Sequence, residues 1–130
     1  MSILPLSTIS CTKNEEEKKE EIVVETKGKG GLDKGEAFYY EKCANCHGSA
    51  GHGDGPQASF LGPKPANLSN AKYMSTLTDE YIFKIISEGG IAVGKSNLMP
   101  RWKFVLSEGD IWNVIAYIRK DICKCEYKGN

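Results

Sequence analysis

Apolar residues recur at the three- and four-residue spacing of a helix in three stretches of the chain. The clearest stretch opens with Ser107 and Asp110, whose spacing resembles a capping box, and then carries four isoleucines along one side. These isoleucines are Ile111, Ile115, Ile118 and Ile122. The pattern predicts a helix from about residue 107 to residue 122.

Two earlier stretches carry helix signals of the same kind. Residues 33–46 place aromatic residues and two cysteines at three- and four-residue steps along adjoining faces. Another stretch begins at Thr78, an N-cap residue type followed by acids that suit the helix dipole, and it stops at Gly89. The sequence therefore predicts three helices.

Residues 47–77, between the first two helices, show neither a helical nor a strand period. They are rich in Gly, Pro, Ser and Asn. An irregular segment of this length is uncommon in a small domain unless it has a function. We therefore expect this loop to wrap around a bound group.

Composition narrows the class of protein. With 130 residues the chain suffices for one compact domain, and 40% of its residues are hydrophobic. Its 17 basic residues balance 17 acidic ones, which argues against a nucleic-acid-binding protein. No apolar run approaches the roughly 18 residues of a membrane-spanning helix. The five cysteines are the feature that points to chemistry.

The charge pattern divides the chain into four parts. Residues 1–11 resemble the end of a lipoprotein leader, in which Cys11 is acylated; alternatively, Cys11 is incidental. Residues 12–31 are charged and Gly-rich, which predicts a flexible tether, with a solvated helix as the alternative. The folded domain is expected at residues 32–126, and residues 127–130 form a tail.

The residues Cys43, Cys46 and His47 form the sequence C-A-N-C-H, which matches the C-x-x-C-H attachment pattern of c-type haem. Each thiol adds across one haem vinyl group as a thioether, and the adjacent imidazole reaches the iron. We therefore predict one covalently bound haem c whose iron is held by His47.

Two other uses of the cysteines remain as alternatives. A redox pair of the thioredoxin type lies at a helix N-terminus within a βαβ pattern, whereas this pair lies near a helix C-terminus. A zinc site could recruit the pair together with Cys123 and Cys125. We do not expect an internal disulfide between these last two cysteines, because a bridge across one residue closes a strained ring. They either bridge to a partner or to a second copy of this protein, or they end the last helix as partly buried thiols.

Several features occur in a characteristic order: Gly35 and Phe38 in the first helix, C-A-N-C-H, the segment G-H-G-D-G-P, a Met99-Pro100 pair, and aromatic residues in the last helix. Over about residues 32–122 the sequence thus resembles the class I, single-haem cytochrome c family of bacterial type. The resemblance implies an all-α cytochrome c fold: three main helices around one covalently bound haem, with a long irregular loop after the haem motif. It also implies a close crossing of the first and last helices. At this crossing we expect Gly35 and Phe38 against Trp112, Ala116 or Tyr117.

The resemblance also implies a set of site residues. Met99 is the expected second axial ligand, with His52 as its rival. The ring of His47 is expected to donate to the carbonyl of a loop proline, either Pro63 or Pro65. Candidate partners of the haem propionates are Trp102, Asn67 and Arg101, and candidate walls of the haem are Tyr73 and Leu98.

These features predict an electron carrier, not an enzyme, that acts in the periplasm or elsewhere outside the cytoplasm, anchored to a membrane if Cys11 is acylated. The alternatives are a haem enzyme with an open distal site, such as a peroxidase, and an electron-transfer subunit of a larger respiratory complex. Redox protein partners are expected to dock at the haem edge, and no nucleic acid is expected to bind. A basic rim suits acidic partners there: Lys42, Lys64, Lys95, Arg101 and Lys103.

Overall fold

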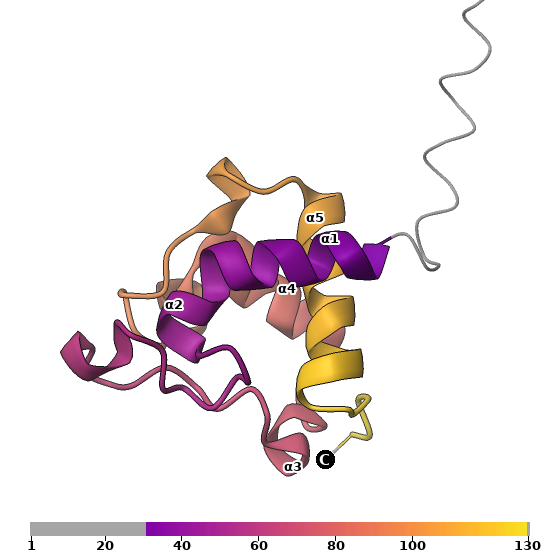
Figure 1. The fold of residues 1–130 in the computed structure, drawn as a ribbon, viewed down its shortest axis with the longest axis horizontal. Helices are drawn as coiled ribbons and strands as arrows, with labels where there is room; N and C mark the ends of the chain where they lie inside the picture. Colours follow the sequence, from indigo (N-terminus) through magenta and orange to yellow (C-terminus); the bar gives the residue numbers. More distant parts are fainter. Residues whose placement is uncertain (1–30, 130) are drawn as a thin grey trace, which may run out of the picture.

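The computed structural model describes residues 31–129, in which all regular structure is helical and no strand occurs (Figure 1). The elements are α1 (Gly31–Phe38), a π-helical turn (Tyr39–Cys43), α2 (Ala44–His47), α3 (Ala71–Met74), α4 (Asp79–Glu88), α5 (Glu108–Tyr117) and a second π-helical turn (Ile118–Ile122). Short 3-10 turns lie at Ala58–Phe60, Gly90–Val93 and Trp102–Phe104. The all-α prediction is confirmed. The predicted leader and all but the last residue of the predicted tether lie outside the described residues.

Two of the three predicted helices begin or end where their signals stand, whereas the stretch predicted as one helix over residues 33–46 is divided into α1, the π-helical turn and α2. In α4 the Thr78 hydroxyl accepts a hydrogen bond of 3.0 Å from the Tyr81 amide, and the helix ends at Gly89 with a positive φ of 81°. In α5 both halves of the capping box form: the Asp110 amide donates to the Ser107 hydroxyl at 3.1 Å, and the Ser107 amide donates to the Asp110 carboxylate at 3.2 Å. Local side-chain chemistry therefore sets these boundaries.

Helices α1 and α5 cross at close range, as Figure 1 shows. A Cβ atom at Gly35 would lie 2.6 Å from the carbonyl carbon of Asn113 and 3.2 Å from the Cβ atom of Tyr117. The expected contact with Tyr117 is confirmed, but the main neighbour of Gly35 is the backbone of Asn113. Trp112 instead stacks on Phe83 of α4, with ring centroids 4.7 Å apart. Neighbouring residues of a helix point in different directions, so Trp112 faces α4 while Asn113 faces α1.

The core lies among α1, α4 and α5. Its fully buried side chains are Tyr39, Met74, Ile111 and Val114. Tyr39 packs against Tyr117 with ring centroids 5.3 Å apart, so the aromatic face of α5 meets the π-helical turn that precedes the cysteine motif. The helix crossing therefore fixes the position of that motif.

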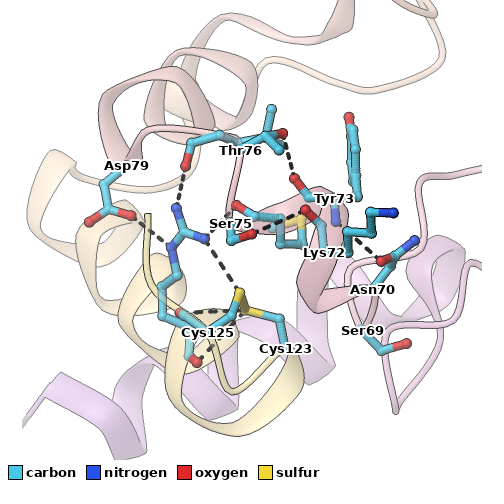
Figure 2. The surroundings of a disulfide bond; sticks show 12 residues. Ser69, Asn70, Lys72, Tyr73, Ser75, Thr76, Asp79, Cys123 and Cys125 are labelled. Atoms are coloured by element: carbon cyan, nitrogen blue, oxygen red, sulfur yellow. Dashed lines mark hydrogen bonds and ion pairs between the residues drawn. A yellow bond between two sulfur atoms is a disulfide. The ribbon is translucent and has the colours of Figure 1, made fainter. Parts of the chain in front are cut away.

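The C-terminal segment contradicts one expectation from the sequence: Cys123 and Cys125 form an internal disulfide (Figure 2). The residue between them, Lys124, has a φ of +50°, and this left-handed turn brings the two Cα atoms to 5.2 Å. That separation is ordinary for a bridged pair, so the closure is accommodated by the backbone. This disulfide contains two of the four cysteines that the zinc alternative requires as ligands.

Substituting Gly35 tests the helix crossing. We expect Gly35→Ala to lower the free energy of unfolding by about 2 kcal/mol, because the added methyl group meets backbone atoms that cannot swing away. Gly109→Ala is the matched control, since its Cβ would meet only the Ser107 hydroxyl at 3.8 Å; it should be neutral or stabilising by up to about 1 kcal/mol. Chemical denaturation measures both. Equal effects of the two substitutions would contradict the close crossing.

Candidate haem-binding site

The two motif cysteines lie on one helical stretch, on either side of the start of α2. Cys43 ends the π-helical turn and is buried, whereas Cys46 lies one turn later and is half-buried. Neither cysteine is in a disulfide. Burial raises the pKa of the Cys43 thiol to about 12, with the nearby Cys46 as the second cause. Both sulfurs are therefore free, one turn apart on the helix.

The irregular loop after the motif folds back onto the end of α2. The carbonyls of Asn45, Cys46 and His47 accept hydrogen bonds from loop amides at 2.8, 3.1 and 2.7 Å, respectively. The donors are Gln57, Gly55 and Gly53. A side chain at Gly55 would collide with the carbonyls of Ala44 and Asn45, which explains why the loop is so rich in glycine. The loop thus supplies hydrogen bonds that a helix end otherwise lacks.

The imidazole of His47 is oriented by a backbone carbonyl. Its Nδ1 atom lies 3.0 Å from the oxygen of Ala66, so the Nδ1–H group donates and Nε2 keeps a free lone pair. Burial lowers the pKa of His47, which favours the neutral ring that binds metals. This arrangement leaves Nε2 available as a ligand of iron.

The acceptor for His47 corrects an expectation, because it is neither Pro63 nor Pro65. The carbonyl of Pro65 instead faces Gly53, where an added Cβ would lie 2.5 Å from it. The carbonyl of the following residue, Ala66, therefore faces the imidazole ring of His47.

Tyr39 is a site residue that the sequence did not reveal. Its side chain is fully buried, and its hydroxyl donates a hydrogen bond of 2.7 Å to the carbonyl of Gly48, directly after His47. Burial raises the pKa of this phenol, so it stays protonated and remains a donor. The only signal was its position four residues before Cys43, on the same helix face.

The loop that carries Met99 is held by the backbone. The carbonyl of Met99 accepts a hydrogen bond of 3.3 Å from the amide of Gly90, and its half-buried side chain packs against the core, as does that of Trp102. An added Cβ at Gly90 would lie 3.3 Å from the Cβ atom of Met99. The structure therefore places both predicted residues on a chain segment anchored beside the core.

His52 belongs to a hydrogen-bonded turn on the surface. Its Nδ1 atom lies 2.9 Å from the Ser69 hydroxyl, which in turn donates to the side-chain oxygen of Asn67 at 2.5 Å. Because that hydroxyl is already used as a donor, His52 donates to it. The exposed ring of His52 thus has a structural partner in the loop.

Several loops of the domain expose apolar side chains that a bound group could cover. Large apolar side chains are exposed on the loops around Met99 and in the loop after the motif: Phe60, Ile91, Leu98, Phe104 and Val105. Burying such side chains under a ligand gains about 25 cal/mol for each Å² removed from water. In the part of the chain that the structure describes, no three His, Cys, Asp or Glu side chains are grouped to hold a bare metal ion.

Comparison with known proteins agrees with this geometry. A family model described as cytochrome c oxidase, cbb3-type, subunit III matches residues 30–118. The chain belongs to the cytochrome c family. Members of this family carry covalently bound haem c and transfer electrons, and their cytochrome c domains are typically extracytoplasmic. Among curated proteins, none matches this cytochrome significantly. Within residues 31–129, no helix of the cytochrome is long and apolar enough to cross a membrane.

Proposed function

We propose that this cytochrome is a single-haem electron carrier in which Cys43 and Cys46 hold the haem covalently and His47 and Met99 are the axial ligands. The observation that carries the proposal is the orientation of His47 by Ala66, beside two free cysteines one helical turn apart. When bound, the haem supplies an iron that alternates between the ferric and ferrous states.

The chain's own residues contribute orientation and burial. Tyr39 holds the peptide after His47, and the loop glycines close the end of α2, so the chain's own hydrogen bonds hold the residues on both sides of the imidazole in place. A thioether at the second axial position favours ferrous iron and raises the reduction potential. These features suit a carrier that accepts and passes on single electrons.

We infer that the carrier works outside the cytoplasm and meets redox protein partners at the haem edge, with acylated Cys11 as a membrane anchor. Two ion pairs reduce the positive charge of the expected basic rim. Lys42 pairs with Glu41 and Lys103 pairs with Glu88, each at 2.8 Å. The description of the matching family, an oxidase subunit, favours a second role as the electron-transfer subunit of a larger respiratory complex.

Mass spectrometry tests the attachment. Denatured protein from cells that mature c-type cytochromes should carry the mass of one haem, and the Cys43→Ser/Cys46→Ser variant should lack it. The matched control is Cys123→Ser/Cys125→Ser, which removes the other two described cysteines and should keep the haem. A wild-type protein with the mass of the bare polypeptide would overturn the proposed function.

A further inference from the structure

An open hollow of about 720 Å³ lies between α3 and the C-terminal end of α5, away from the motif residues. In Figure 1, α3 and the yellow segment that follows α5 are neighbours at the bottom of the view. The charged residues that line the hollow are Lys72, Arg119, Lys120, Lys124, Glu126 and Lys128. We call these residues the basic hollow.

The positive charge of the basic hollow is not compensated within the domain. Arg119 is already paired with Asp79 at 2.8 Å. Across residues 31–129, none of the four lysines forms an ion pair with a carboxylate. Four lysines against the single Glu126 leave a net charge of +3. Such a concentration of like charge attracts a polyanionic group.

The wall that carries two of these lysines is fixed in place. Lys124 lies between the bridged cysteines, and the amide of Lys128 donates a hydrogen bond of 2.9 Å to the carbonyl of Ser75 in the segment after α3. Figure 2 shows the disulfide beside Ser75 and Lys72. The lysines are thus presented by an anchored backbone rather than by a free tail.

The chain itself contains a segment of matching charge. Residues 15–21, E-E-E-K-K-E-E, hold five glutamates and two lysines, a net charge of −3. Nine residues, 22–30, separate this acidic segment from Gly31, the first residue of α1. The acidic segment is therefore the densest run of acidic residues in the part of the chain that precedes the domain.

The distances allow the two to meet. Gly31 lies against Asn113 of α5, where an added Cβ would be 3.1 Å from the side-chain amide carbon. From Asn113 to Lys120 is seven residues along the helix, or about 10 Å of rise. A nine-residue linker with the stiffness of a Gly-rich coil spans about 17 Å on average. The average length of the linker exceeds this rise, so the acidic segment can reach the basic hollow.

We propose that the acidic segment, residues 15–21, docks into the basic hollow of its own chain. The contact is electrostatic, so it weakens as salt shortens the Debye length. The covalent connection provides a local concentration in the millimolar range without a large interface.

Zero-length carbodiimide crosslinking of the full-length, haem-loaded protein tests the proposal, with peptide mapping of the monomer fraction. We expect amide links from the acidic segment to the lysines of the basic hollow, with a yield at Lys128 that falls at least about threefold in 0.5 M salt. The variant K72Q/K120Q/K124Q should lower the yield at the unchanged Lys128 by a similar factor. The control K64Q/K84Q/K95Q, which removes three exposed lysines elsewhere, should leave it unchanged.

Three results would overturn the proposal. One is an unchanged yield at Lys128 in the hollow variant. Another is equal linking of the acidic segment to Lys64, Lys84 and Lys95 in the wild-type protein. The third is linking found only in dimers, which would assign the hollow to a second copy of the chain. All substituted lysines are exposed, so the visible spectrum and the helix content should stay unchanged in both variants.

Discussion

Replacing Met99 with alanine is expected to leave the haem attached but to open the second axial position. The ferric protein should lose the weak far-red absorption of sulfur-to-iron bonding, and its reduction potential should fall on the order of 100 mV or more, since axial ligands are the main determinant of haem potentials. The loop should stay in place without the thioether, because the Met99 carbonyl and not its side chain bonds to Gly90. Spectra and a redox titration measure both changes.

Met74→Leu is the matched control for this substitution. Met74 is almost fully buried in the core, and a volume-conserving exchange there should cost less than about 1.5 kcal/mol and leave spectrum and potential unchanged. If Met99→Ala keeps the far-red absorption while Met74→Leu loses it, the ligand assignment is wrong. A wild-type protein that lacks the absorption and binds cyanide has an open distal site, which favours the haem-enzyme alternative.

The helices were predictable because their ends depend on neighbouring residues. The caps at Thr78 and Ser107 form the hydrogen bonds that their spacing indicates. Helix α3 was not predicted, since four residues show no period; its signal is the Asn70 side chain, which accepts a hydrogen bond of 3.2 Å from the Tyr73 amide. A cap residue without an apolar repeat is too weak a signal to assign a helix.

The site was predictable where its chemistry is local. Cys43, Cys46 and His47 stand within five residues, so one helical turn brings them together. The acceptor at Ala66 depends on how the loop returns from a distant part of the chain, which no spacing rule gives. The disulfide was missed for a related reason: it requires a positive φ at Lys124, and a lysine gives no sign of that.

The Arg119→Ala substitution should lower the free energy of unfolding by about 3 kcal/mol, the largest stability effect that we expect in this domain. The side chain of Arg119 is only 10% exposed, and it joins the π-helical turn after α5 to the stretch that runs from the end of α3 to the start of α4. It donates to the carbonyls of Met74 and Leu77 at 2.7 and 2.5 Å and to the Asp79 carboxylate at 2.8 Å (Figure 2). Removing it leaves the carbonyl of Leu77 without its donor, whereas the carbonyl of Met74 keeps a hydrogen bond of 3.2 Å from the Leu77 amide.

Two controls separate these contributions. Arg101→Ala removes the chain's other arginine, which is exposed, and should change stability by less than about 0.5 kcal/mol. Asp79→Asn removes the charge of a half-exposed partner and should cost at most about 1 kcal/mol. A loss of about 3 kcal/mol lowers the melting temperature of a domain of this size by roughly 12–24 °C, well within the reach of calorimetry. If Asp79→Asn costs as much as Arg119→Ala, the ion pair and not the carbonyl contacts holds the two segments together.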